Sequence, residues 1–319
     1  MHFFQRVTIT LLIAFGLVVG SAGVGLAQDE DTPTITVGSK NYTEQLILGE
    51  MLSLMLEDAG YDVDRQLYLG STAIVHEGLV SGEIDTYVEY TGTALIAILG
   101  QSAPTAGGDG AATPASTPTV SAAEQVYNTV AEAYPDEFGA VWLDPLGFNN
   151  TFALAVTQET AEEYDLQTIS DLQGLAGELT IGSDPEFSVR EDALPGLEET
   201  YDIEFGTVQT LDVGLLYSAV AEGDVDISAA ASTDGRIPAL DLVLLEDDMG
   251  FFPPYFAAPV VNQELLEQYP ELEEVLNQLA GLFDDAAMAD LNAQVDVDDM
   301  EPIDVARDFL EDQGIIGDE

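Results

Sequence analysis

The 319-residue chain contains no cysteine. This absence excludes disulfide bonds, thiolate metal sites, thiol-based catalysis and a lipid-modified N-terminal cysteine. Histidine is also scarce, since only His2 and His76 occur. A hydrolytic triad needs a nucleophile beside a base, and the run Ser232-Thr-Asp234 has no histidine next to it. We therefore expect no enzyme, no cofactor and no metal site.

Basic residues are the second scarcity, because 6 Lys and Arg stand against 60 Asp and Glu, for a net charge of −54. Nucleic acid is excluded as a partner, since phosphate binding needs basic patches. The hydrophobic content of 46% is too high for an acidic disordered chain. We expect a folded protein with an acidic shell. Concentrated salt screens such repulsion, with a Debye length of roughly 3 Å at 1 M, which suggests hypersaline surroundings.

The N-terminus has a single Arg6, an apolar run over residues 7–19 and a small-residue end at Ala27. This pattern predicts a secretory signal peptide over residues 1–27, which would export the protein to a periplasmic or other extracytoplasmic location. The alternative is that the segment is retained as a membrane anchor. Beyond Ala27, five basic residues remain, and each is expected to have a specific partner, either an internal acid or a ligand: Lys40, Arg65, Arg190, Arg236 and Arg307.

Residues 85–93 (DTYVEYTGT), followed by an apolar run over 94–99, predict a strand end, a tight turn and a helix start. The free N–H groups of a helix start attract an anion, and Thr91 and Thr93 are residues that cap one. Tyr87 and Tyr90 add aromatic faces that attract a cation. The stretch is therefore suited to a zwitterionic ligand.

Residues 34–38 predict a strand, and Asn41 with Glu44 forms a capping box that starts a helix. Lys40 lies just ahead of this helix and adds a second attraction for an anion. A strand over 61–69 and a helix over 71–81 follow. The β-α-β-α-β-α pattern predicts an α/β fold with a mostly parallel sheet, whose ligand site lies at the carboxyl ends of the strands.

The remaining chain predicts a second lobe with a similar pattern. Residues 80–85 resemble residues 221–226, and the same register aligns Tyr90 with Ala231, so we expect two loops that face each other across a cleft. Residues 101–121 have the composition of a flexible insertion. Two crossings then divide the chain into lobe 1 and lobe 2, as in a binding protein that closes over its ligand. The predicted bounds are 34–145 and 251–319 for lobe 1 and 146–250 for lobe 2, with C-terminal helices over 263–282, 284–294 and 302–313.

Five motifs in order resemble the glycine betaine/choline/carnitine substrate-binding proteins of osmoprotectant ABC transporters: residues 38–45 (GSKNYTEQ), 89–93 (EYTGT), 149–156 (NNTFALAV), 232–236 (STDGR) and 252–255 (FPPY). The resemblance spans nearly all of residues 34–318. It implies a type II periplasmic-binding-protein fold with two hinge crossings and a ligand cleft between the lobes.

The resemblance also implies the roles of seven residues. An aromatic cage for a quaternary ammonium falls on Tyr90, Phe152 and Tyr255. A clamp for the carboxylate falls on Lys40, Thr93 and Arg190, with Asn150 as a nearby polar contact. The chain departs from the family at Phe152, often a Tyr, and at Ala231, where a cage Tyr is expected.

The function that this resemblance implies is capture of a glycine betaine-like zwitterion by a monomer, which then docks on the membrane permease of an ABC transporter. The loss of an aromatic at Ala231 would weaken betaine binding, by about tenfold, or admit a bulkier zwitterion such as proline betaine, carnitine or ectoine. Choline or another small solute, and a sensory binding module without a transporter, are the alternatives.

Overall fold

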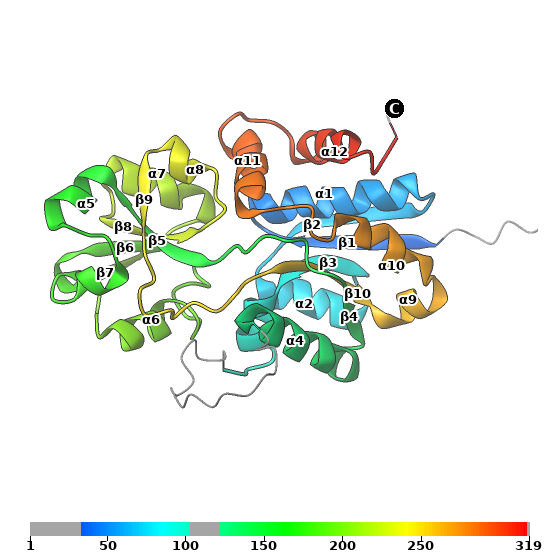
Figure 1. Ribbon diagram of the computed structural model, residues 1–319, viewed down its shortest axis with the longest axis horizontal. Helices are drawn as coiled ribbons and strands as arrows, with labels where there is room; N and C mark the ends of the chain where they lie inside the picture. The colour runs from blue at the N-terminus through cyan, green and yellow to red at the C-terminus, as the bar shows by residue number, and fades with distance from the viewer. Residues whose placement is uncertain (1–32, 103–120, 318–319) are drawn as a thin grey trace, which may run out of the picture. The chain divides into compact units, whose positions relative to one another are not determined.

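The structure is a computed structural model that describes residues 33–102 and 121–317. Within these ranges the chain forms two five-stranded sheets covered by helices, which we call lobe 1 and lobe 2 (Figure 1). The predicted signal peptide 1–27 and most of the predicted insertion 101–121 lie outside the described residues. In the described part, no helix has the length and apolar character that crossing a membrane requires.

Lobe 1 contains a sheet with the strand order β2-β1-β3-β10-β4. Strand β1 is parallel to β2 and β3, as the sequence predicted, whereas β10 is antiparallel to β3 and β4. The strands are β1 (Thr34–Lys40), β2 (Asp62–Gly70), β3 (Thr86–Tyr90), β4 (Ala140–Trp142) and β10 (Ala257–Asn262).

The helices of lobe 1 are α1 (Thr43–Asp58), α2 (Thr72–Ser81), α3 (Thr91–Thr93), α4 (Ala122–Phe138), α9 (Gln263–Gln268), α10 (Glu271–Leu276), α11 (Asp285–Asp296) and α12 (Pro302–Asp312). Helix α3 continues into a π-helical turn over Ala94–Ile98. The predicted single helix over 263–282 is wrong, because it breaks between α9 and α10. Pro270 follows Tyr269, whose φ of −131° and ψ of 70° are not helical, and a residue before proline is disfavoured in the helical region.

Lobe 2 has the strand order β7-β6-β8-β5-β9. Strand β6 is parallel to β7 and β8, and β5 is antiparallel to β8 and β9, so the sheet repeats the pattern of lobe 1. The elements are β5 (Phe152–Thr157), α5 (Gln158–Tyr164), β6 (Thr180–Ser183), α6 (Leu194–Tyr201), β7 (Thr207–Thr210), α7 (Leu216–Glu222), β8 (Ile227–Ala231), α8 (Arg236–Ala239) and β9 (Leu242–Leu245). Helix α6 begins at Leu194, with Pro195 in its first turn, where proline costs no hydrogen bond.

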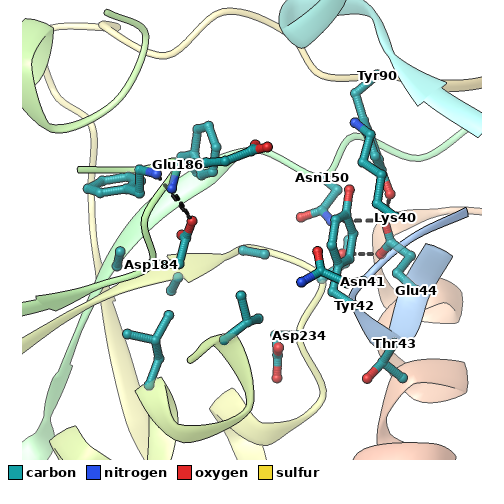
Figure 2. A pocket seen from close by; sticks show the side chains of 18 of the residues that line it. Lys40, Asn41, Tyr42, Thr43, Glu44, Tyr90, Asn150, Asp184, Glu186 and Asp234 are labelled. Atoms are coloured by element: carbon teal, nitrogen blue, oxygen red, sulfur yellow. Dashed lines mark hydrogen bonds between the residues drawn. The ribbon is translucent and has the colours of Figure 1, made fainter. Parts of the chain in front are cut away.

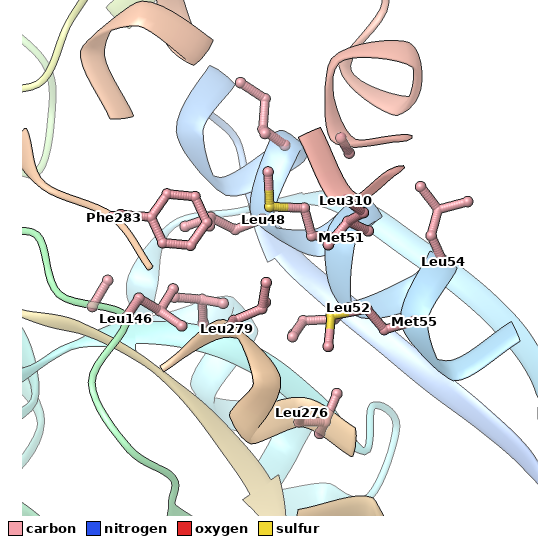
Figure 3. Packing of buried hydrophobic residues seen from close by; sticks show 14 of the residues in the cluster. Leu48, Met51, Leu52, Leu54, Met55, Leu146, Leu276, Leu279, Phe283 and Leu310 are labelled. Atoms are coloured by element: carbon pink, nitrogen blue, oxygen red, sulfur yellow. The ribbon is translucent and has the colours of Figure 1, made fainter. Parts of the chain in front are cut away.

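Helix α1 is the centre of the lobe 1 core. The spacing of Leu48, Met51, Leu52, Met55 and Ala59 predicts one apolar helix face. The first four are buried, whereas Ala59, the C-cap of the helix, is exposed. Buried residues extend beyond this face to other sides of the helix, and the C-terminal helices pack against it (Figure 3). A helix that is covered on nearly all sides is apolar nearly all round. The residues that pack around it include Leu146, Leu276, Leu279, Phe283 and Leu310.

Two extended segments connect the lobes, one before β5 and one before β10 (Figure 1). They run side by side, since Asn149 and Phe256 form an antiparallel bridge and the Tyr255 backbone N–H donates to Asn149 Oδ1 at 2.7 Å. The Asn150 N–H also donates to the Tyr255 carbonyl oxygen at 3.2 Å. These bonds place a polar and an aromatic pocket residue at the junction of the lobes.

The predicted similarity between residues 80–85 and 221–226 is confirmed in the structure. Each segment ends a helix at a left-handed glycine, Gly82 with φ 75° and Gly223 with φ 78°. Each then places an aspartate against the first parallel strand of its lobe. The Asp85 carboxylate accepts from the Thr36 N–H at 2.8 Å, and the Asp226 carboxylate accepts from the Thr180 N–H at 2.7 Å.

Two predicted helix caps are wrong. Helix α1 starts after Tyr42, which makes no side-chain cap, and Glu44 turns into the protein instead of closing a capping box with Asn41. Thr91 and Thr93 do not cap α3 either. The Thr91 hydroxyl donates to the Pro254 carbonyl oxygen at 3.0 Å, so it ties β3 to the second crossing. In both cases tertiary partners replace the local hydrogen bond.

Candidate ligand-binding site

A cavity of about 240 Å³ lies between the two lobes. Lobe 1 contributes the carboxyl ends of β1 and β3, and lobe 2 contributes the end of β8 and the loop after β6. In Figure 2, Glu44 and Asn150 lie on one side of the cavity and Asp184 and Glu186 on the other. Tyr87, which the sequence also suggested as a contact for a cation, is buried and does not line this cavity. The seven residues to which the resemblance assigned roles all line it: Lys40, Tyr90, Thr93, Asn150, Phe152, Arg190 and Tyr255.

Lys40 is the last residue of strand β1, and its side chain is buried. Its Nζ donates to Glu89 Oε1 at 2.5 Å and lies 5.1 Å from the centroid of the Tyr90 ring. An ammonium has three N–H groups, and Glu89 is the one acceptor recorded for it among the described residues. Lys40 therefore has an internal acid partner and still has N–H groups to offer a ligand.

The Arg190 guanidinium is held by Asp192, whose two carboxylate oxygens accept from Nε at 2.8 Å and from Nη2 at 2.5 Å. Nη2 also donates to Thr93 Oγ1 at 3.1 Å, so Arg190 of lobe 2 contacts a lobe 1 residue. Nη1 makes a single longer contact of 3.4 Å with Glu186. The two N–H groups of Nη1 are thus the donors of Arg190 that the protein uses least.

The predicted aromatic residues form two groups. Phe152 and Tyr255 pack edge to face with centroids 5.3 Å apart, and the Arg190 guanidinium lies 5.3 Å from the Phe152 centroid. Tyr90 stacks instead on Tyr42, with centroids 6.4 Å apart and planes 30° apart. Tyr42 also lines the cavity and was missed by the sequence reasoning, although it lies inside the quoted motif at residues 38–45.

Glu44 is a buried carboxylate on the cavity wall that the sequence assigned to a helix cap. Its Oε1 accepts from the Tyr90 hydroxyl at 2.6 Å and from Asn150 Nδ2 at 2.8 Å. Its Oε2 accepts from the Thr233 hydroxyl at 2.5 Å and from Asn292 Nδ2 at 3.0 Å. Burial raises the pKa of Glu44, and these four hydrogen bonds oppose that effect.

No basic side chain lies within ion-pair distance of Glu44 among the described residues. The four hydrogen bonds use the lone pairs of both oxygens, but they do not cancel the negative charge. The ionised carboxylate therefore presents a charge to the cavity that lacks a protein cation.

A second aromatic residue was also missed. Tyr217 of α7 is buried at the cavity, and its hydroxyl accepts from the backbone N–H of Ala231 at 3.0 Å. One face of its ring is 4.4 Å from the Arg236 guanidinium. Nothing in the sequence distinguished Tyr217 from a core residue of an amphipathic helix, since only the fold brings it beside Ala231.

Hydrogen bonds join the lobes directly at two sides of the cavity. On one side, Glu186 of lobe 2 accepts from the Thr72 N–H at 2.7 Å and from its hydroxyl at 3.2 Å. On the other side, Thr233 of lobe 2 donates to Glu44 and its carbonyl oxygen accepts from Asn292 Nδ2 at 2.9 Å. The described residues contain no cluster of three His, Asp or Glu side chains that could hold a metal ion.

The fold and the cavity define a two-lobed binding protein of the type II periplasmic class. A family profile described as the substrate-binding domain of the ABC-type glycine betaine transport system (OpuAC) matches residues 33–312. The chain therefore belongs to this family.

The names of known proteins that are similar to this chain are consistent with this family. The carnitine transport binding protein OpuCC of Listeria monocytogenes is 34% identical over 304 residues, which covers 94% of each chain. The ergothioneine transport permease/binding protein EgtU of Helicobacter pylori is 34% identical over 98% of this chain, which spans 53% of that longer protein. A crystal structure of a glycine betaine/carnitine/choline ABC transporter protein is 33% identical with a TM-score of 0.68, covering 88% of this chain and 99% of that one.

Proposed function

We propose that the protein is the extracytoplasmic substrate-binding component of an ABC importer for compatible solutes and that it binds a quaternary-ammonium zwitterion such as glycine betaine. The observation that carries this proposal is the composition of one cavity. Aromatic rings, the buried Lys40, the partly buried Arg190 and a buried carboxylate without a cationic partner line it together. A zwitterion can satisfy both signs of charge at once.

The cationic end of the ligand suits the side of the cavity around Glu44. A trimethylammonium group has no N–H and needs no free lone pair, so a carboxylate whose lone pairs are all used can still attract it. Ring faces stabilise such a cation by about 0.5–2 kcal/mol each. We assign this role to Tyr90, Phe152 and Tyr255, and we add Tyr42 because it stacks on Tyr90 at the cavity.

The carboxylate end of the ligand suits Lys40, Thr93 and Arg190. Lys40 Nζ and Arg190 Nη1 have N–H groups that the protein leaves unused or weakly used. Lys40 is buried and Arg190 is mostly buried, with 11% of its side chain exposed. Hydrogen bonds between buried charged groups are stronger than those between neutral groups. Asn150 is a neighbouring polar contact on the same cavity.

Tyr217 supports the aromatic part of the proposed site, at the position where Ala231 replaces the family's cage tyrosine. Its hydroxyl bonds to the Ala231 backbone, so an aromatic ring from α7 lies beside the position where β8 lacks one. We propose that Tyr217 provides part of the missing aromatic surface. The three alanines 229–231 leave space beside it for a zwitterion larger than glycine betaine.

We further propose that residues 1–27 direct export, that the protein acts as a monomer in saline surroundings, and that its ligand-bound form delivers the solute to a membrane permease. The family description supports the transport role. The acidic composition supports the saline habitat, since 60 acidic residues repel one another unless salt screens them.

The test is isothermal titration of the protein in molar salt with glycine betaine, proline betaine, carnitine, ectoine and choline. Two matched pairs isolate the ends of the ligand. Choline replaces the carboxylate of glycine betaine, and 3,3-dimethylbutanoate replaces its charged nitrogen by carbon with nearly the same shape. We expect glycine betaine or a larger betaine to bind. Choline and 3,3-dimethylbutanoate should each bind at least tenfold more weakly than glycine betaine, a difference of about 1.4 kcal/mol.

Two results would contradict the proposal. Equal binding of 3,3-dimethylbutanoate would show that the cavity does not recognise the cation. Absence of binding by every zwitterion, in a protein that folds in the same salt, would remove the proposed ligand class.

A further inference from the structure

A side chain of lobe 2 caps a helix of lobe 1. The Glu186 carboxylate accepts from the Thr72 backbone N–H at 2.7 Å and from the Thr72 hydroxyl at 3.2 Å. Thr72 is the first residue of helix α2, and it is buried at the wall of the cavity. In Figure 2, the Glu186 side chain extends from the lobe 2 side of the cavity toward lobe 1. This contact exists only while the two lobes are together.

Helix α2 has no cap from its own lobe. Its N-cap residue, Ser71, makes no side-chain hydrogen bond to the helix, and the first turn contains no acidic residue. Among the described helices of ten or more residues, α2 alone lacks both features, since α4 and α11 have capping side chains and α1 and α12 have an acid in the first turn. The free N–H groups and the positive end of the helix dipole favour a nearby carboxylate. Glu186 supplies that carboxylate from the other lobe.

The loop that carries Glu186 is held in place within lobe 2. The Asp184 carboxylate accepts from the backbone N–H groups of Glu186 at 2.8 Å and of Phe187 at 3.2 Å. The Phe187 side chain is fully buried and packs edge to face on Phe152, with centroids 5.3 Å apart. The loop continues to Arg190, whose Nη1 lies 3.4 Å from Glu186 Oε2. Glu186 thus lies between a residue of the proposed carboxylate clamp and the start of α2.

We propose that Glu186 is a positioning residue that latches the two lobes together by capping α2 from the opposite lobe. Opening the lobes leaves the start of α2 without this carboxylate, so the latch favours closure whether or not a ligand is bound. A ligand that binds the closed form then binds more tightly, because a larger fraction of the protein is ready to bind it. Glu186 sets the affinity in this way without contacting the ligand. The inference goes beyond the proposed function, since it holds for whichever solute the cavity takes.

The first measurement follows the lobes in the ligand-free protein. Because the chain has no cysteine, labels attach only to introduced cysteines at two exposed positions, Glu132→Cys on α4 of lobe 1 and Glu199→Cys on α6 of lobe 2. Single-molecule energy transfer between the labels gives the ratio of closed to open molecules. We expect the ligand-free wild type to visit the closed form, and Glu186→Ala to lower this ratio about fivefold, the effect of one helix cap.

Glu191→Ala is the matched control. It removes the same charge from an exposed residue five positions further along the chain, which does not line the cavity. The ratio of closed to open molecules should stay as in the wild type.

Thr72→Pro then tests the partner of Glu186. Proline has neither an N–H nor a hydroxyl, so both donors are lost. The first position of a helix tolerates proline, and Ser71, with φ −71° and ψ 165°, already has the conformation of a residue before proline. Titration with glycine betaine should show each single variant binding about fivefold more weakly than the wild type. The double variant should bind no more weakly than either single variant, because both changes remove the same contact.

Two results would overturn the inference. One is an equal ratio of closed to open molecules in the ligand-free wild type and in Glu186→Ala, because a residue that only contacts the ligand cannot change the ligand-free equilibrium. The other is a double variant in which the two losses multiply, as separate structural effects would. The ligand-free measurement needs no betaine, so it tests the latch even if the proposed function fails. Binding of glycine betaine would still support the proposed function if the latch is absent.

Discussion

Glu44 shows how a single side chain at the cavity combines opposing effects. Burial favours its neutral form and raises its pKa, while Tyr90, Thr233 and two asparagine amides donate to the ionised form. Since the folded chain holds this proton more tightly than the unfolded chain, Glu44 costs no stability below the unfolded pKa. Its cost appears as the pH rises through the raised folded pKa.

Glycine betaine should therefore bind more tightly as the pH rises from about 4.5, the ordinary value of Glu44, through its raised pKa. A ligand cation beside the carboxylate favours its ionised form and releases the proton. Calorimetry at several pH values, in buffers of different ionisation heat, measures both affinity and proton release. Burial also raises the pKa of Asp184 and Asp296, which line the same cavity.

Glu44→Gln separates these contributions. The change removes the charge at similar size, so the slope of affinity against pH should decrease by the part that Glu44 causes. Equal slopes in the wild type and in Glu44→Gln would show that Glu44 does not titrate with binding.

Arg190→Ala should abolish measurable betaine binding, and it should also lower the free energy of unfolding by about 3–5 kcal/mol. The second effect arises because Asp192 is buried and would lose its bidentate partner. Among the described residues, its carboxylate would keep only the Tyr255 hydroxyl at 2.7 Å. Denaturant unfolding in molar salt measures the stability, and titration measures the binding.

The double variant Arg190→Ala with Asp192→Asn distinguishes the two roles. Removing the unpaired charge should recover much of the stability, whereas binding should stay lost because the clamp is still missing. Recovery of binding in the double variant would show that Arg190 acts only by neutralising Asp192.

Among the elements, the junction of β3 and α3 packs closely against the second crossing. A Cβ added at Gly92 would lie 2.7 Å from two ring carbons of Tyr255 and 2.9 Å from the Pro254 carbonyl oxygen. Both neighbours belong to the second crossing. The glycine therefore lets the helix start contact the crossing and the Tyr255 ring closely.

Gly92→Ala should shift Tyr255 and destabilise the fold by about 1–3 kcal/mol, the usual effect of overfilling a packed site. Betaine affinity should fall with it. Gly177→Ala is the control, since the nearest atom to its added Cβ is 3.8 Å away. Thermal unfolding measures the stability of both variants, and titration measures their affinity for the betaine. An unchanged affinity in Gly92→Ala would show that Tyr255 does not contact the ligand.

At the scale of the molecule, the main feature is the excess of negative charge. The chain has sixty acidic and six basic residues. The basic residues at the cavity and on β2 are already paired with acids, as in Lys40–Glu89, Arg65–Glu50 and Arg236–Asp234. Most carboxylates therefore have only solvent and salt to reduce their mutual repulsion.

The unfolding temperature should rise as sodium chloride increases from 0.1 to 1 M, because the Debye length falls from about 10 to 3 Å. If screening adds about 2 kcal/mol, the rise is roughly 3 °C for a protein of this size, because the entropy of unfolding grows with chain length. Sucrose at matched osmolarity is the control for effects that do not depend on charge. A midpoint that is flat in salt would contradict an adaptation to saline surroundings.

The sequence by itself determined the order of strands and helices and the residues at the carboxyl ends of the strands. Periodicity and glycine stops are local signals. They could predict Lys40 at the end of β1, Tyr90 at the end of β3 and the glycine-aspartate similarity between the lobes. The local signals failed where a distant partner competes with a nearby one, as at the predicted caps Asn41–Glu44 and Thr91.

Only the tertiary structure decided what surrounds these residues. Glu44 meets Thr233 and Asn292, which lie 189 and 248 positions away in the chain, and Tyr217 lies beside Ala231 through the packing of α7 on β8. Only the structure shows the acid partners of the two basic clamp residues, Glu89 for Lys40 and Asp192 for Arg190. The physical reason is that burial leaves a charged or polar group only the partners that the fold brings to it, and spacing along one chain does not specify them.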